Sequence, residues 1–202
     1  MTRKSSRMRR LLSSFLAAMM LVAMLPVSAL AVGAENTGSF VTGPYLMTPK
    51  TNGMVVVWEL DKPMKSIITY GTSDADQKTL EVPVEEGEKF KGESMHMYRA
   101  RLSDLKPAST YTYKVETENG QTMEGHFRTL SEKPDEVRFI VVSDSHRFET
   151  ATQVSDVIAK FDPDFILHTG DMVEGTGSQK DQFPYWFQNV GSFLHNVPVI
   201  YN

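Results

Sequence analysis

The sequence predicts two architectures in series: a β-sandwich over residues 40–130 and the first strands of an α/β domain over residues 137–202. Three observations support this prediction. The first region lacks helical periodicity and contains short apolar runs separated by turn residues, which is typical of a sandwich. The second region alternates apolar strands with a helical stripe, which is typical of parallel α/β units. Residues 131–136 form a polar, proline-containing link, and we place the domain boundary there.

Residues 1–31 have the features of a signal peptide and are set aside from the fold. A basic start is followed by an apolar run over residues 11–25 and by the small-residue cleavage site Ala29-Leu30-Ala31. The apolar run is shorter than the about 20 residues that cross a bilayer comfortably. We therefore expect a secreted or cell-surface protein that meets the membrane only during export. An uncleaved anchor is the alternative.

Charge and cysteine content narrow the classes of partner. The chain has 21 basic and 25 acidic residues, a formal net charge of −4. Cleavage after Ala31 removes five basic residues, so 202 − 31 = 171 residues remain, with 21 − 5 = 16 basic residues and a net charge of 16 − 25 = −9. This balance argues against a nucleic-acid-binding surface. Because the chain has no cysteine, any metal must be held by oxygen and imidazole.

Strand patterns recur through residues 40–130. Large apolar residues occupy every second position from Met54 through Trp58 to Leu60, so they share one face of a strand. Asn119-Gly120 predicts a tight hairpin turn. Further strands are predicted over residues 66–70, 95–102, 111–116 and 123–129. We expect this β-domain to support its neighbour rather than to carry chemistry.

Residues 137–171 contain a strand–helix–strand unit. The apolar runs 137–142 and 165–167 predict two buried strands. The residues between them that have the spacing of an amphipathic helix are Val154, Val157, Ile158 and Phe161. Asp162-Pro163 ends this helix, because proline cannot extend it. Strands joined by such a crossover run parallel.

A second helix and a third strand are predicted after a polar loop. The apolar residues of this helix are Phe183, Trp186, Phe187, Val190 and Leu194. Pro184 suits its first turn. Residues 197–201 predict the third strand of the same sheet, and we expect that strand to present an unpaired edge.

Two acids and a histidine follow the first two strands of this unit. Asp144 and His146 come just after the first strand, and Asp171 comes after the second. Ligands in open α/β sheets bind outside the carboxyl ends of the strands, so we expect these side chains to lie together. Carboxylate and imidazole ligands suit Mn, Fe and Zn. Taken singly, each aspartate is more typical of a turn or a helix cap than of a metal ligand, and it is their joint placement at the ends of consecutive strands that favours the metal site.

Three other histidines are interpreted as structural. His168 precedes Asp171 by three positions inside an apolar strand, so we expect a packed, hydrogen-bonded side chain rather than a metal ligand. His126 belongs to the β-domain, and His195 lies near a helix end.

Several segments of the first region resemble a known domain. The segment Leu105 to Tyr111 resembles the tyrosine corner of fibronectin type III domains, with Tyr111 as the corner residue. The full ordered set of segments is Gly43-Pro44-Tyr45-Leu46, Trp58, Tyr70-Gly71, the tyrosine corner and Phe127-Arg128-Thr129. In that order the segments resemble the fibronectin III-like N-terminal domain of purple acid phosphatases and their bacterial relatives.

The second region resembles the calcineurin-like metallophosphoesterases, whose α/β/β/α domain begins with the motifs D-x-H and G-D. Asp144 and His146 match the first motif, and Asp171 matches the second. The resemblance implies two metal ions, Fe, Mn or Zn, with Asp144 and His146 on the first ion and Asp171 bridging both. Purple acid phosphatases carry Gly where this chain has His146, and a metal-binding Tyr where it has Glu174, so a tyrosinate-coloured iron centre is not expected.

The resemblance implies an exported acid phosphatase-like hydrolase of phosphate monoesters or diesters. The third motif of the family normally follows a strand such as residues 197–200, and we do not assign it to Asn202. We therefore expect the chain to be an incomplete N-terminal part, inactive alone, with no catalytic residue assigned beyond the metal ligands. The alternative is a secreted, non-catalytic binding or adhesion module.

Overall fold

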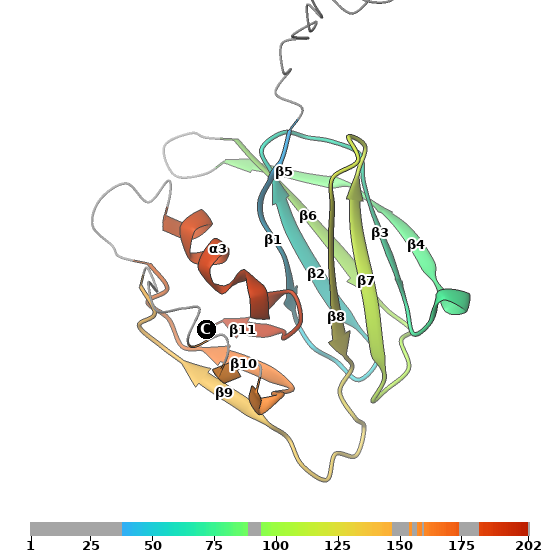
Figure 1. Cartoon of the computed structure of the whole chain (residues 1–202), viewed down its shortest axis with the longest axis vertical. Coiled ribbons are helices and arrows are strands. Elements are labelled where there is room, and N and C mark those ends of the chain that lie inside the picture. Colours follow the sequence, from blue (N-terminus) through green and yellow to red (C-terminus); the bar gives the residue numbers. More distant parts are fainter. Residues whose placement is uncertain are drawn as a thin grey trace, which may run out of the picture. The chain divides into compact units, whose positions relative to one another are not determined.

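A computed structural model describes residues 38–88, 94–146, 154, 157–158, 160–173 and 182–201. The predicted signal peptide and Glu174 lie outside these residues. None of the described helices is long and apolar enough to cross a membrane. Figure 1 shows the β-rich part of the chain beside α3 (Gln182–Leu194) and the last three strands.

The first region is a sandwich of two antiparallel layers, as the turn-rich pattern predicts. One layer has the order β5-β6-β2-β1 within a larger sheet, and the other has the order β4-β3-β7-β8. Its strands are β1 (Phe40–Met47), β2 (Met54–Leu60), β3 (Ser66–Gly71), β4 (Lys78–Val82), β5 (Val84–Glu88), β6 (Ser94–Leu102), β7 (Thr110–Thr117) and β8 (Thr122–Arg128), with a short 3-10 turn at Asp74–Asp76. The predicted strands are confirmed within two residues at their ends.

Three strands of the sandwich, β1, β4 and β5, were not predicted from the sequence. β1 contains Gly43-Pro44, and proline cannot donate to a ladder, so this segment does not resemble a strand that is paired on both sides. Its pairing with β2 is irregular there, with register shifts on both sides of Thr42. β4 is exposed at every position except Val82, so it lacks an apolar stripe. β5 has charged side chains at most positions.

The second region is a parallel strand unit, as predicted. β9 (Phe139–Val142) pairs with β10 (Phe165–His168), and β10 pairs with β11 (Val199–Tyr201). The described residues from Val154 to Phe161 are helical. The carboxyl ends of β9, β10 and β11 therefore share one edge of the sheet.

The expectation that the third strand presents an unpaired edge is wrong. β11 lies between β10 and β1, and its pairing with β1 is parallel, with Met47 opposite Val199. One seven-stranded sheet therefore runs through both regions in the order β5-β6-β2-β1-β11-β10-β9. The reason is that β1 has β2 on one side only, so its other side is free to accept a strand. The outer strand of the parallel part is β9, and the division into two domains stays a prediction.

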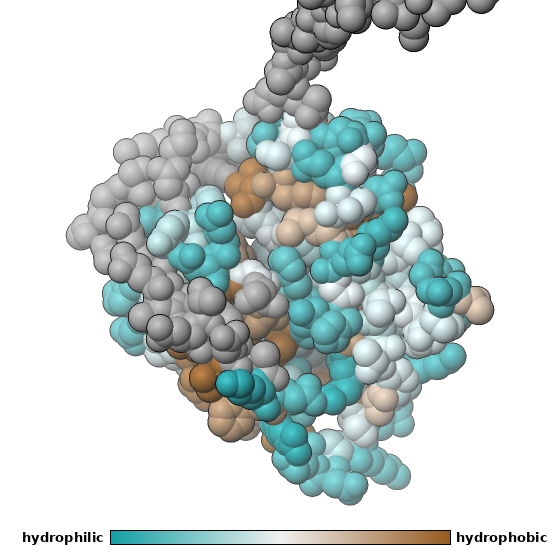
Figure 2. Space-filling view, viewed as in Figure 1, coloured by the Kyte–Doolittle hydropathy of each residue, from teal (hydrophilic) through white to brown (hydrophobic). Residues whose placement is uncertain are grey.

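The expectation that β9 is buried is also wrong. Phe139 and Val141 are 54% and 55% exposed, because β9 is the outermost strand and these side chains point away from the helices. The predicted helical stripe is likewise buried only in part: Ile158 is 2% exposed, whereas Phe161 is 62% exposed. Figure 2 shows hydrophobic surface over β9 and β10.

Two hydrophobic cores share the large sheet. The first lies between the sandwich layers and includes Trp58 and Tyr98, whose rings stack at 5.5 Å. The second lies on the opposite face, where Trp186 and Val190 of α3 pack with Ile158 and with Val57 of β2. Both faces of β2 are thus buried, which explains why Val57 and Glu59 are covered although they do not belong to the predicted apolar stripe.

The tyrosine corner predicted from the sequence is present. The backbone N–H of Lys106 donates to Tyr111 Oη at 2.9 Å. Thr129 reinforces the same corner, because its hydroxyl accepts from Ser109 N–H at 3.0 Å and donates to Lys106 O at 2.7 Å. These bonds fix the end of β8, from which the chain leaves the sandwich.

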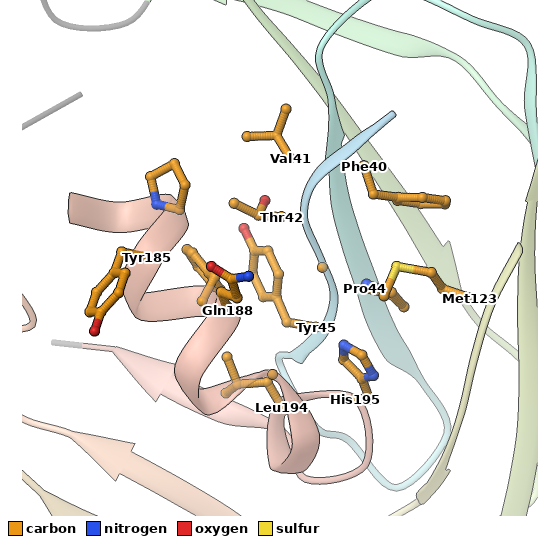
Figure 3. Close-up of a pocket in the computed structure, with 14 residues that line it drawn as sticks. Phe40, Val41, Thr42, Pro44, Tyr45, Met123, Tyr185, Gln188, Leu194 and His195 are labelled. Carbon is orange, nitrogen blue, oxygen red and sulfur yellow. The ribbon is translucent and has the colours of Figure 1, made fainter. Parts of the chain in front are cut away.

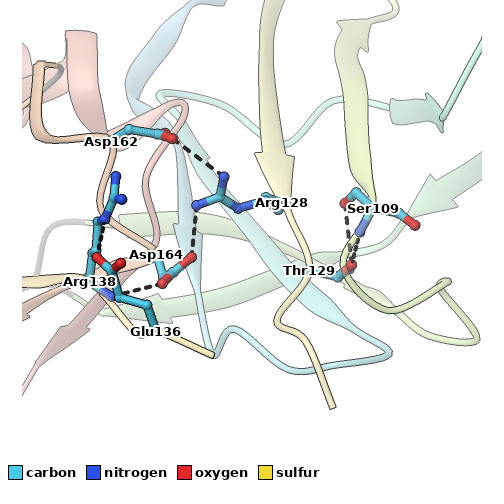
Figure 4. A network of polar contacts seen from close by, with 7 residues as sticks. All are labelled: Ser109, Arg128, Thr129, Glu136, Arg138, Asp162 and Asp164. Carbon is cyan, nitrogen blue, oxygen red and sulfur yellow. Dashed lines mark hydrogen bonds and ion pairs between the residues drawn. The ribbon is translucent and has the colours of Figure 1, made fainter. Parts of the chain in front are cut away.

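An ion-pair network follows this corner and connects β8 to the second region (Figure 4). Arg128 contacts Asp164 at 2.8 Å and Asp162 at 3.4 Å, and both acids precede β10. Asp164 also accepts from the backbone N–H of Arg138 at 2.9 Å, just before β9. Hydrogen bonding to Asp164 raises the pKa of Arg128. The network connects the turn before β10 and the residue before β9 to the last strand of the sandwich.

A second contact joins the sandwich to the end of α3. Tyr113 Oη donates to His195 O at 2.8 Å, and the backbone N–H of His126 donates to Asn196 Oδ1 at 3.0 Å. Gly125 makes this approach possible, because a Cβ there would lie 2.4 Å from His195 O. Burial raises the pKa of Tyr113 far above its usual range, so its hydroxyl stays protonated and able to donate.

Candidate metal centre

The three predicted ligands lie together at the carboxyl edge of the parallel strands. Asp144 and His146 follow β9, and Asp171 follows β10. One ligand atom from each residue falls within 4.8 Å of the others, and His146 Nε2 lies 3.8 Å from Asp171 Oδ2. The side chains of His146 and Asp171 are 46% and 52% exposed, so the group is open to solvent.

The backbone of these ligands is held in an unusual conformation. Asp144, His146 and Asp171 have φ values of 49°, 44° and 55°, in the left-handed region that most side chains avoid. Each such residue costs on the order of 1 kcal/mol and persists only where its surroundings impose it. Aspartate and histidine adopt this region more often than most other residues do, so both residue types suit these positions even though the conformation has a cost.

Backbone hydrogen bonds between the two ligand loops impose that conformation. Asp144 N–H donates to Gly170 O at 3.2 Å, and His146 N–H donates to Asp171 O at 3.3 Å. One step earlier, Thr169 N–H donates to Val142 O at 2.9 Å. The ladder between β9 and β10 therefore continues past the strand ends and sets the spacing of the two loops.

The donor set fits a metal ion that prefers oxygen and nitrogen. Two carboxylates and one imidazole are ligands for Mn, Fe or Zn. His146 Nε2 faces Asp171, whereas His146 Nδ1 is buried and has no hydrogen-bond partner among the described residues. Asp144 Oδ2 accepts a hydrogen bond from Ser143 Oγ at 2.6 Å, which orients that carboxylate. Whether these residues bind metal stays a prediction.

His168 lies beneath the cluster rather than in it. It is 2% exposed and its Nε2 is 3.0 Å from Ser145 Oγ, which confirms the packed, hydrogen-bonded side chain expected from its strand. Burial lowers the pKa of His168, and the nearby carboxylate of Asp144 opposes this shift. Ser145 also accepts from Trp186 Nε1 at 2.8 Å. The sequence did not reveal these two partners, since Ser145 appeared as a spacer and Trp186 as a core residue.

Two of the three remaining histidines, His126 and His195, were interpreted as structural, and neither belongs to the cluster. The His126 side chain is exposed on β8, and only its backbone N–H makes the contact with Asn196. His195 follows α3, and burial lowers its pKa.

A hollow of about 590 Å³ opens elsewhere, between β1, β8 and α3 (Figure 3). Its walls are mostly apolar and aromatic, with Tyr45, Met123 and Leu194 among them, and His195 at one end. It contains none of the three predicted ligands. Its lining has no carboxylate, so we do not take it as the site of metal chemistry.

Comparisons with known proteins match each region to a family. Residues 44–129 match the family model described as "Purple acid Phosphatase, N-terminal domain". Residues 137–201 match the model described as "Calcineurin-like phosphoesterase". A comparison with curated protein sequences finds no significant match.

Two solved structures share the fold over most of the chain. Purple acid phosphatase PPD1 from yellow lupin (Lupinus luteus) seeds aligns with a TM-score of 0.58 and 20% identity, covering 78% of this chain and 34% of that one. A structure described as PhoD aligns with a TM-score of 0.58 and 12% identity, covering 81% and 38%. The chain therefore spans about a third of the length of either structure. The first region is thus similar to the purple acid phosphatase N-terminal domain, and the second region is similar to the calcineurin-like phosphoesterases.

Proposed function

We propose that this chain contributes one part of a two-metal centre that hydrolyses phosphate esters. In this proposal Asp144 and His146 would hold one metal ion, and Asp171 would be a ligand shared by that ion and a second one. The observation that carries the proposal is the convergence of three ligand atoms within 4.8 Å of one another, at the ends of two parallel strands. The family matches support it, because both regions match families of phosphoesterases.

The chemistry follows from the charges and exposure of these side chains. When bound, the metal ions would activate a water molecule and neutralise charge on the phosphoryl oxygens. Asp171 has two carboxylate oxygens, so it can contact two cations at once. His146 can offer a ring nitrogen as a ligand beside the two carboxylates. The half-exposed side chains leave room for a phosphate group to approach from solvent.

We infer that turnover needs more than these three ligands. A second metal ion requires its own donors, and the leaving oxygen requires a proton donor. The searched part of the chain contains one ligand cluster only. We propose that the three ligands alone hold a cation loosely and do not turn over substrate, and that a two-metal centre with further ligands acts on phosphate monoesters or diesters. The signal-peptide pattern of residues 1–31 supports export with cleavage near Ala31. Intact-mass analysis of secreted material tests this, and a mass that still includes Met1 would contradict the cleavage.

Metal titration of the purified chain tests the proposed centre. Mn²⁺ binding is followed by electron paramagnetic resonance for the wild type, Asp171→Asn and, as a matched control, the exposed His126→Asn. Loss of Asp171 should weaken Mn²⁺ binding at least about tenfold, since even residues that only support a metal ligand change affinity by that much. His126→Asn should leave affinity unchanged.

The same samples are assayed for p-nitrophenyl phosphate hydrolysis with added Mn, Fe or Zn. No turnover is expected. A wild-type chain that binds none of these metals would contradict the proposed centre. Metal-dependent turnover abolished by Asp144→Ala would contradict the need for further ligands.

A further inference from the structure

Ser145 separates two of the candidate ligands and points the opposite way from them. Asp144 and His146 are open to solvent, whereas Ser145 is 6% exposed. Its hydroxyl oxygen lies 2.8 Å from Trp186 Nε1 on α3 and 3.0 Å from His168 Nε2 on β10. Both partners are only 2% exposed. One hydroxyl therefore connects the loop after β9 to two other elements inside the second core.

The direction of each hydrogen bond follows from the chemistry of the partners. The indole N–H of Trp186 can only donate. Gly170 N–H donates to His168 Nδ1 at 3.2 Å, so Nδ1 is unprotonated and the proton of the neutral ring is on Nε2. His168 Nε2–H therefore donates to Ser145 as well. Ser145 Oγ accepts two hydrogen bonds, and both of its lone pairs are used.

These bonds act where the backbone is strained. The residues on both sides of Ser145 have left-handed φ values, 49° for Asp144 and 44° for His146. The backbone bonds from these residues to Gly170 and Asp171 hold the loop on its solvent side. Ser145 holds it on the buried side, and without that anchor the strained loop is free to relax.

The two donors to Ser145 pack against each other and against further aromatic rings. Trp186 packs edge-on against Phe187 with ring centroids 5.1 Å apart, and Phe187 contacts Tyr45 of β1 at 4.7 Å. His168 packs edge-on against Trp186 at 5.7 Å. The two donors to Ser145 thus support each other and rest on the central strand of the large sheet.

We propose that Ser145 is a positioning residue: held by Trp186 and His168, it keeps Asp144 and His146 in the conformation in which both can face one cation. This inference deepens the proposed function and rests on it. Ser145 touches neither metal nor substrate. Its role is to stabilise the loop conformation in which Asp144 and His146 both have left-handed backbone angles.

The test compares Ser145→Ala with Ser66→Ala in the full chain. Ser66 is a matched control, because its side chain is also buried and its hydroxyl donates to a backbone carbonyl within the sandwich, far along the chain from the cluster. Ser145→Ala should weaken Mn²⁺ binding about 10- to 100-fold, the range typical of residues that orient metal ligands. Ser66→Ala should leave the dissociation constant for Mn²⁺ within about twofold of the wild-type value. This holds even if Ser66→Ala lowers the melting temperature as much as Ser145→Ala does.

Two further variants separate positioning from packing. His168→Gln can still present an N–H near the position of Nε2, whereas His168→Leu cannot, so the glutamine variant should retain more of the Mn²⁺ affinity. Trp186→Phe removes one donor and keeps an aromatic ring. This variant breaks a hydrogen bond that Ser145→Ala also breaks. The double variant should therefore lose less Mn²⁺ affinity than the sum of the two single losses in binding free energy.

A metal-free readout keeps the two proposals distinguishable. In chelated protein, amide hydrogen exchange at Asp144 and His146 should be at least about tenfold faster in Ser145→Ala than in the wild type, and unchanged in Ser66→Ala. A wild type that binds no Mn²⁺ would contradict the proposed function, while exchange would still decide the role of Ser145. Equal Mn²⁺ affinity and equal exchange in the wild type and Ser145→Ala would overturn the positioning role.

Discussion

Gly125 and Gly191 lie on opposite sides of the contact between β8 and the end of α3, and the space around them differs. A Cβ on Gly125 would lie 2.4 Å from His195 O and 2.6 Å from Tyr113 Oη. A Cβ on Gly191 would meet only His195 Nε2, at an ordinary 3.6 Å. Gly191 lies inside α3, where glycine costs conformational entropy.

Alanine at these two positions should change stability in opposite directions. Gly125→Ala forces a backbone carbonyl and a buried tyrosine apart, and overpacking of this kind costs about 1–3 kcal/mol. Gly191→Ala should gain up to about 1 kcal/mol from helix propensity. Urea unfolding followed by circular dichroism measures both values. Destabilisation of similar size in both variants would mean that the close approach at Gly125 is not what distinguishes the two sites.

The candidate ligands were predictable at the residue scale because their signal is local. Asp144, His146 and Asp171 follow apolar runs, and the edge they share follows from parallel pairing. Ser145 and Trp186 were not predictable, because their hydrogen bond joins residues 41 positions apart and exists only in the packed core. The sequence pattern around a serine between two ligands, or around a tryptophan in a helical stripe, does not indicate whether the two side chains are in contact.

At the element scale, the strands of each region were predictable and the pairing between regions was not. Alternation within a strand reports which face is covered, but not which edge has a neighbour. β1 and β11 meet through one register pair, Met47 with Val199, and no pattern in either segment indicates it. The burial of both faces of β2 was not predictable for the same reason. It results from the pairing of β11 with β1, which goes together with the packing of α3 over the outer face of the sandwich sheet.

The contact of α3 with the sandwich should depend on the hydroxyl of Tyr113. Tyr113→Phe keeps the ring and removes the donor to His195 O, so that a carbonyl at the end of α3 loses its partner. The expected cost is about 1 kcal/mol, typical of a lost hydrogen bond. Tyr185→Phe is the matched control, because Tyr185 lies on α3 itself and is 40% exposed. Equal unfolding free energies for both variants would show that the hydroxyl contributes nothing at this contact.

At the scale of the whole molecule, the outer face of the parallel strands is apolar and uncovered within the described residues. Phe139 and Val141 of β9 are more than half exposed, and Ile200 of β11 is 37% exposed. Phe139 stacks on Phe165 of β10 at 5.5 Å, so the apolar surface is continuous across neighbouring strands. β9 is also the terminal strand of the seven-stranded sheet, and an exposed apolar edge strand favours pairing with other chains.

A single charge on this edge should therefore reduce self-association of the chain. Val141→Lys places an ammonium on the exposed side of β9, where it disfavours pairing between edges and breaks the apolar surface. Leu80→Lys is the matched control: Leu80 is 41% exposed on β4, the terminal strand of the other sheet, but its neighbours on β4 are polar. Light scattering after size exclusion, over a range of protein concentrations, should show less association for Val141→Lys and no change for Leu80→Lys. If Leu80→Lys reduced association as much, net charge rather than the β9 edge would be the cause. If neither variant changed it, the chain would associate through another surface, and the hydrophobic face of β9 and β10 would not be the part of the molecule that limits its solubility.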